Sequence, residues 1–172
     1  MTMRTCGRCG CKLDVLSRAD ARYCSTRCRV AAHRSRAMPA EMTAGRRWVR
    51  ADGKRPVTIT GRPASSTNPA TWATLADVRA STAGDGMGVM LGSGLGCYDL
   101  DHATDADARA FIATIPEPVL FVERSMSGTG VHAFVSAAES PGSRRVVDGL
   151  HVERYTRARF IRTTGDRFTP RG

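Results

Sequence analysis

Long apolar runs are missing from this sequence. No stretch stays apolar over the roughly 20 residues that a membrane-spanning helix needs, and residues 1–5 lack the apolar segment of a secretory signal. Internal repeats and low-complexity segments are also lacking. We therefore expect a cytoplasmic chain that does not interact with membranes.

Acidic residues are scarce in the first third of the chain. Residues 1–62 carry fifteen Lys and Arg against four Asp and Glu, whereas residues 63–172 carry eleven against twelve. The excess of basic residues that gives the net charge of +10 therefore lies entirely within residues 1–62. Lys and Arg release counterions when they neutralise phosphates, so this asymmetry favours a polyanion as partner. A solvated basic face would give the same composition.

Cysteine is concentrated at the front as well, since five of the six cysteines fall in the first 28 residues. In a cytoplasmic chain this points to metal binding rather than to disulfides. Two close pairs of cysteines are separated by fourteen residues, and each pair can coordinate one metal ion from a knuckle or a turn of helix. The predicted zinc ligands are Cys6, Cys9, Cys24 and Cys28. Cys11 could replace Cys9, and Cys97 is expected to be a small buried residue.

This cysteine module, residues 1–36, is predicted to bind rather than to catalyse. Four thiolates leave zinc no open coordination position. Arginines surround the cysteines, and Tyr23 is the one aromatic residue among them, so phosphate contact is favoured over base stacking. Residues 37–46 are predicted to be a linker, and residues 47–172 a second domain.

The order of strands and helices in the second domain fits an α+β or an α/β domain with one main sheet, and we predict the α+β class. Helices are expected over 25–36, 68–84 and 104–115, and strands over 86–91, 96–101, 119–124, 131–136, 150–155 and 159–164. The first two strands are split by a Gly-Ser-Gly turn and are expected to be a hairpin or neighbours.

Alternation along the later strands separates two faces, because successive residues of a strand point to opposite sides. Val131, Ala133 and Val135 are predicted to face a core, which places His132 and Phe134 on the other side. By the same rule, Leu150 and Val152 are buried, while His151, Glu153 and Tyr155 share the opposite face.

Three acidic residues and a glycine-rich turn are the candidates for a functional site. Asp99 and Asp101 end a strand on the same face and could share a hard divalent ion. Glu153 adds a third carboxylate. Residues 125–130 form a glycine-rich turn whose backbone N–H groups could approach phosphate, and it leads to His132. Taken singly, each feature has an ordinary explanation as a solvated strand end, a flexible loop or a surface side chain.

Taken in order, these motifs resemble the archaeo-eukaryotic primase superfamily, specifically the primase-polymerase domains of phages, plasmids and prophages. The resemblance rests on four ordered motifs and runs from about Arg47 to Arg167. The motifs are Asp99-Leu100-Asp101, Ser127-Gly128-Thr129-Gly130-Val131-His132, Val152-Glu153, and Arg159-Phe160 with Thr163-Thr164-Gly165.

The resemblance implies an RRM-like sheet packed with a smaller α/β unit. It also implies template-dependent nucleotidyl transfer, as DNA primase or DNA polymerase. It assigns Mg²⁺ or Mn²⁺ to Asp99, Asp101 and Glu153, and triphosphate contact to His132. Residues that would help to hold nucleotide or template are Ser127, Gly128, Gly130, Arg159 and Lys54. The implied partners are a DNA primer-template, nucleoside triphosphates and, as often accompanies such domains, a replicative helicase.

Two other functions are compatible with part of the pattern. A metal-dependent glycosyltransferase also uses an Asp-x-Asp motif, but it would not explain the glycine-rich turn with its His or the Val-Glu element. A non-catalytic, zinc-dependent DNA-binding or regulatory protein with a degenerate primase-polymerase fold is the stronger rival.

Overall fold

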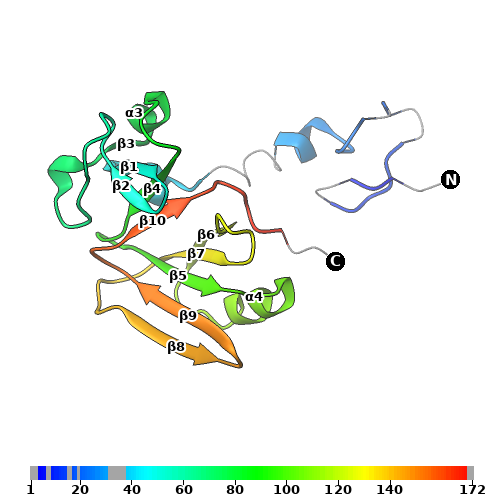
Figure 1. Cartoon of the computed structure of the whole chain (residues 1–172). Helices are drawn as coiled ribbons and strands as arrows, with labels where there is room; N and C mark the ends of the chain where they lie inside the picture. The colour runs from blue at the N-terminus through cyan, green and yellow to red at the C-terminus, as the bar shows by residue number, and fades with distance from the viewer. Residues whose placement is uncertain (1–3, 7–8, 15–16, 19, 31–37, 170–172) are drawn as a thin grey trace. The chain divides into compact units, whose positions relative to one another are not determined.

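The chain divides into two compact units, Met1–Met38 and Pro39–Gly172. The computed structural model describes residues 4–6, 9–14, 17–18, 20–30 and 38–169. Most regular structure in the second unit is strand, arranged in two antiparallel sheets with few helices, as Figure 1 shows. No helix within the described ranges is long and apolar enough to cross a membrane.

The first unit begins with a tight turn around its first cysteines. Thr5 and Lys12 form an antiparallel bridge, and the N–H groups of Cys6 and Gly10 donate to the carbonyls of Cys11 and Cys6. Gly10 has φ of 72°, a left-handed conformation that glycine adopts without strain.

A helical turn over residues 26–30 follows in the first unit. The hydroxyl of Ser25 accepts from the N–H of Cys28 at 3.2 Å, which confirms the predicted N-cap. The continuation of this helix to residue 36 lies outside the described residues.

The first sheet of the second unit has the order β10-β4-β1-β2, with β3 paired to β1. Its strands are β1 (Arg46–Asp52), β2 (Arg55–Val57), β3 (Ala73–Thr74), β4 (Gly86–Met90) and β10 (Phe160–Thr163). The short helix α2 (Ala40–Thr43) precedes β1 and buries Met42 completely. The stretch predicted as a linker over 37–46 therefore holds structured residues of the second unit from Pro39 onward.

The expected helix over 68–84 is shorter in the structure. Asn68 caps only the 3-10 turn η1 (Pro69–Thr71), and the helix α3 (Leu75–Ala80) starts later, with Thr74 as its N-cap. Thr74 and Asp77 form a capping box, in which each side chain accepts from the other residue's backbone N–H. Residues 73–74 pair with β1, so this strand pairing overrides the helical pattern there.

The second sheet has the order β6-β7-β5-β9-β8. Its strands are β5 (Leu95–Asp101), β6 (Val119–Arg124), β7 (Val131–Ser136), β8 (Ser143–Val147) and β9 (Leu150–Tyr155). The prediction that β4 and β5 form a hairpin or neighbours is wrong, because these strands belong to different sheets. One main sheet was likewise expected, and the structure has two.

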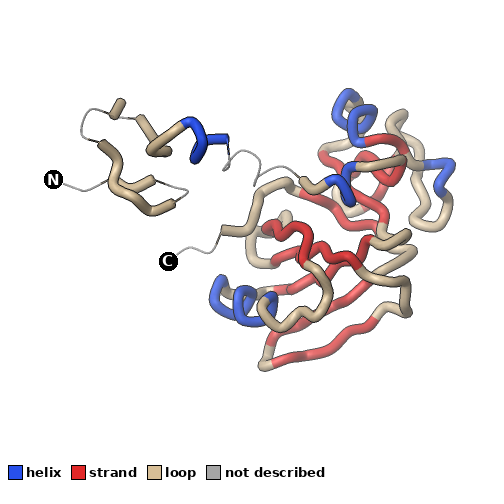
Figure 2. Tube along the Cα trace, turned by 180° about the vertical axis from the view of Figure 1, so that it is seen from behind, coloured by secondary structure: helices blue, strands red, loops and turns tan. Residues whose placement is uncertain are grey.

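One face of the second sheet carries the apolar core, to which the helix α4 (Asp105–Ile112) contributes. Figure 2 shows this helix beside the strands of the sheet. The core contains the residues predicted to be buried, Val131, Ala133, Val135, Leu150 and Val152, together with Ala108 and Phe111 of α4. The predicted alternation on β7 and β9 is therefore confirmed, and the side chains of His132 and Glu153 lie on the opposite face.

Candidate functional site

The four predicted cysteines of the first unit form a cluster that could hold a metal such as zinc. The sulfur atoms of Cys6, Cys9, Cys24 and Cys28 all lie within 4.8 Å of one another. Cys11 is not part of this group and instead contacts the carbonyl of Cys9. The cluster therefore contains Cys9 rather than the alternative Cys11.

The electrostatics of this cluster suit a cation. Hydrogen bonding from neighbouring thiols, that of Cys9 first, raises the pKa of Cys24 to about 12. The backbone N–H of Cys11 is the main cause that lowers the pKa of Cys9. Thiols this close cannot all ionise without a positive charge between them, and a bound metal ion provides that charge.

In the second unit, five polar side chains form a row across all five strands of the second sheet. Asp99 on the central strand β5 is in register with His132 of β7 on one side and with Glu153 of β9 on the other. The row continues to Glu123 of β6 and to Arg144 of β8. Directly opposed residues share a face with Cβ atoms about 5 Å apart. Strand pairing thus brings Asp99, His132 and Glu153 together, although they are distant in the sequence.

The row is buried at its β6 end and open at its β8 end. The exposed fraction of the side chain is 0% for Glu123, 10% for His132, 21% for Asp99 and 71% for Arg144. The segment after β10 covers the buried end, where the N–H of Arg124 donates to the carbonyl of Asp166. The row is therefore more accessible at its β9 and β8 end than at its β6 end.

His132 lies between two carboxylates. Its Nδ1 is 3.1 Å from Oε1 of Glu123, and its Nε2 is 3.6 Å from Oδ1 of Asp99. Burial acts to lower the pKa of His132, but the hydrogen bond to Glu123 and the charge of Asp99 outweigh it and raise this pKa. The imidazole is therefore well suited to carry a positive charge toward an anionic ligand.

Asp99, with a side chain 21% exposed, is nearly as enclosed as Glu153 at 20%. Burial raises the pKa of Asp99, the charge of His132 opposes this rise, and the charges of Asp101 and Glu153 add to it. Repulsion among three carboxylates is what a bound divalent cation would relieve. The donor set, which consists only of carboxylate oxygens, suits Mg²⁺ or Mn²⁺.

The three carboxylates nevertheless do not converge as tightly as the cysteines. Among the described residues, only the cysteine cluster has three or more ligand atoms all within 4.8 Å. The carboxylate of Glu153 is engaged elsewhere: Arg144 Nε lies 2.7 Å from Oε1, and the hydroxyl of Tyr155 donates to Oε2 at 2.8 Å. Arg159 Nη2 lies 3.6 Å from Oε2, and its guanidinium stacks on the ring of Tyr155. Glu153 would have to exchange these partners to bind a metal.

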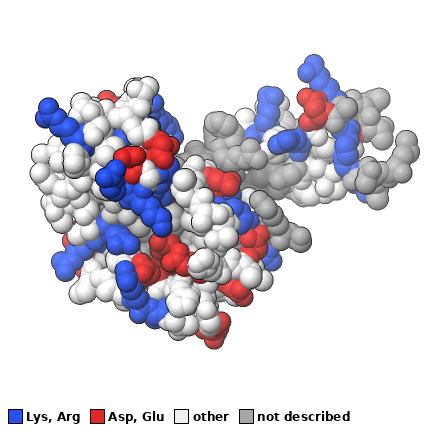
Figure 3. Space-filling view, viewed as in Figure 1, with Lys and Arg blue, Asp and Glu red and all other residues white. Residues whose placement is uncertain are grey.

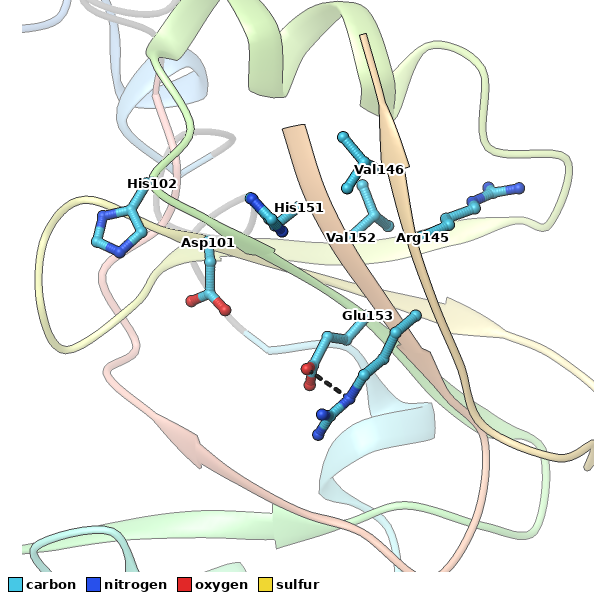
Figure 4. Close-up of a pocket in the computed structure, with 8 residues that line it drawn as sticks. Asp101, His102, Arg145, Val146, His151, Val152 and Glu153 are labelled. Carbon is cyan, nitrogen blue, oxygen red and sulfur yellow. Dashed lines mark ion pairs between the residues drawn. The ribbon is translucent and has the colours of Figure 1, made fainter. Parts of the chain in front are cut away.

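A pocket of about 500 Å³ opens beside the exposed end of the row. Its polar lining consists of Asp101, His102, Arg144, Arg145, His151 and Glu153. In Figure 4 the carboxylates of Asp101 and Glu153 lie on one side of the strands, and Arg145 points away from them. Figure 3 shows acidic and basic side chains next to each other on this side of the second unit. Such a lining can hold a metal ion and phosphate groups together.

No protein-family model matches the chain, and no curated protein matches it.

The glycine-rich turn precedes β7 and His132, as expected. The backbone conformation and the close packing of the turn explain why glycines occur there. Gly128 has φ of 76° and closes a turn by donating to the carbonyl of Ser125. A Cβ on Gly130 would lie 2.8 Å from the carbonyl oxygen of Leu100, so the neighbouring strand needs glycine there. Ser127 hydrogen-bonds to the hydroxyls of Ser125 and Thr129.

Lys54, predicted to help hold nucleotide or template, lies apart from the row. It is an exposed residue in the turn between β1 and β2 of the first sheet. Among the described residues it forms no ion pair.

Sequence analysis missed Glu123 and Arg144. Glu123 follows Phe121 by two residues, so a charged residue lies on the same buried face of β6 as an apolar one. This break in the apolar pattern could have indicated a functional residue. Arg144 lies on β8, a mostly exposed strand without apolar alternation, so no sequence pattern indicated it.

Proposed function

We propose that the Pro39–Gly172 unit is a primase-polymerase-like nucleotidyltransferase that extends or starts a nucleic-acid strand on a DNA template. The observation that carries this proposal is the register of Asp99 with both His132 and Glu153. Three of the four motifs that resemble primase-polymerases each contribute a residue to this row, and Asp101 follows Asp99 by two residues on the same strand. The fourth motif lies on and around β10 in the first sheet.

In this proposal Asp99, Asp101 and Glu153 hold Mg²⁺ or Mn²⁺. Such ions would activate the attacking hydroxyl and stabilise the pyrophosphate leaving group. His132 donates from Nε2 to a phosphate of the incoming nucleotide. Arg144 and Arg159 neutralise Glu153 in the free protein. Arg144 lines the pocket, and both arginines would be free to contact the triphosphate once Glu153 binds a metal.

We further propose that the cysteine unit binds one zinc ion and contacts nucleic-acid phosphates. Four thiolates are the full ligand number of a structural zinc site, and the exposed arginines around them carry positive charge toward phosphate. Elemental analysis of protein purified without chelator should give one zinc per chain. Protein without zinc would contradict this assignment.

The experiment that tests the catalytic proposal is incorporation of labelled nucleotide by the full chain with Mg²⁺ or Mn²⁺. Primed and unprimed DNA templates should be compared with deoxynucleotides and ribonucleotides. Metal-dependent incorporation on any of them supports the proposal. Its absence on all of them, with retained DNA binding, would favour a non-catalytic DNA-binding protein, in which Arg144 and Arg159 neutralise Glu153 permanently.

A further inference from the structure

Glu123 has no role in the mechanism above, although it is the only acidic residue among the buried side chains of the described part of the chain. Its side chain is 0% exposed. Burying a carboxylate is costly unless hydrogen bonds compensate for its lost hydration. The partners of Glu123 therefore indicate what this residue is for.

Three donors converge on the two oxygens of this carboxylate. Oε1 faces Nδ1 of His132 at 3.1 Å. Oε2 accepts from the backbone N–H groups of Thr164 and Gly165 at 3.2 and 2.9 Å. All these contacts use Glu123 as an acceptor, so the ring nitrogen that faces it is the donor.

This contact determines what His132 can do. An imidazole whose Nδ1–H is held by a carboxylate has a fixed ring orientation. Its other nitrogen, Nε2, then points along the row toward Asp99, at 3.6 Å from Oδ1. Phe134 adds an edge contact, with ring centroids 6.3 Å apart. Without Glu123, the ring could turn and present Nδ1 instead.

We propose that Glu123 is a positioning residue that holds His132 by Nδ1, so that Nε2 is always presented to the phosphates of a bound nucleotide. The same carboxylate fastens residues 164–165, after β10, to the edge of the second sheet. The nucleotide part of this inference rests on the proposed function, whereas the Glu123–His132 contact does not.

The test compares nucleotide binding and histidine NMR in Glu123→Gln and His132→Ala proteins. Glutamine keeps the size of the side chain but has one acceptor oxygen, so it cannot serve both His132 and the two backbone N–H groups. We expect Glu123→Gln to weaken equilibrium binding of a Mn²⁺–deoxynucleoside triphosphate about tenfold. In the His132→Ala background the same change should have no further effect, because both substitutions remove one interaction.

The control is Thr164→Val, which removes the hydroxyl that donates to the carbonyl of Arg124 and accepts from the N–H of Asp166. It loosens the same segment without touching His132. Nucleotide affinity should be unchanged in this variant. Equal losses in Thr164→Val and Glu123→Gln, or additive losses in the double variant with His132→Ala, would overturn the positioning role.

Histidine NMR separates this proposal from the proposed function. In ¹⁵N-labelled wild-type protein without nucleotide, Nδ1 of His132 should carry a proton, and this signal should shift or exchange faster in Glu123→Gln. An unprotonated Nδ1 in the wild type would overturn the contact itself. If the NMR result is as expected but the wild type binds no nucleotide, the proposed function fails and the positioning of His132 stands.

Discussion

At the scale of single residues, we predict that Arg144 competes with a metal ion for Glu153. Its guanidinium lies 2.7 Å from Oε1 of that carboxylate, although the arginine side chain is 71% exposed. Arg144→Ala should therefore tighten Mn²⁺ binding to the nucleotide-free protein by up to about fivefold, the range expected for a surface ion pair. The same variant should bind a nucleoside triphosphate more weakly. Titration with Mn²⁺ followed by electron paramagnetic resonance measures the first effect.

Arg145→Ala is the matched control for this prediction. Arg145 is the next residue on β8, and its guanidinium lies over the ring of Phe111, on the core face of the sheet. Its removal costs the same charge without freeing Glu153. Equal Mn²⁺ affinity in the Arg144→Ala protein and the wild type would show that Arg144 does not compete for the ligand.

The sequence predicts which side chains share a face of a strand, but not which residues lie opposite each other on neighbouring strands. Strand alternation is a local property, so the position of His132 and Glu153 opposite the core followed from a few neighbouring residues. The register that puts Asp99 between them depends on the pairing of β5 with β7 and β9, which are distant in sequence. Partners such as Arg144 depend on that register too, so they became visible only in the structure.

At the scale of elements, the capping box is what starts α3 at Leu75. The hydroxyl of Thr74 accepts from the N–H of Asp77, and the Asp77 carboxylate accepts from the N–H of Thr74. Thr74→Ala should therefore lower the free energy of unfolding by about 1 kcal/mol. Chemical denaturation followed by circular dichroism measures this.

Thr82→Ala provides the comparison, because Thr82 is an exposed residue just beyond α3 and takes no part in the cap. It should unfold at the denaturant concentration of the wild type. Equal stability of the Thr74→Ala and Thr82→Ala proteins would contradict the cap's contribution.

Elements with apolar alternation were predictable, and elements without it were not. The strands over 119–124, 131–136 and 150–155 have the predicted bounds. Strands β1 and β2 were missed because Gly53 and several arginines give residues 46–57 the composition of a linker. The turn between them is nevertheless fixed, since Asp85 accepts from the N–H of Gly53. That contact spans more than thirty residues, so no local pattern could reveal it.

At the scale of the whole molecule, the positive charge of the cysteine unit should set the affinity for nucleic acid. Four exposed arginines there can be neutralised together: Arg18, Arg22, Arg27 and Arg29. Their replacement by glutamine should weaken DNA binding and reduce the slope of log affinity against log salt by about 0.9 per lost phosphate contact. Fluorescence anisotropy at several salt concentrations measures both.

An equal loss of charge elsewhere is the control for this salt dependence. Four exposed arginines of the second unit serve the purpose: Arg62, Arg79, Arg109 and Arg157. If their replacement by glutamine reduces the slope as much, DNA binding reflects net charge rather than the cysteine unit.

The central claim is that the row on the second sheet performs nucleotidyl transfer, and nucleotide incorporation by an Asp99→Asn/Asp101→Asn protein tests it most directly. Asparagine keeps the size of each side chain but removes the charge that would bind metal. Asp148→Asn is the matched control, because Asp148 lies in the β8–β9 turn with φ of 50°, a conformation that asparagine adopts well. We predict that the double variant folds as the wild type does and loses incorporation at least about a hundredfold, while Asp148→Asn retains it. Incorporation that persists unchanged in the double variant would contradict the account.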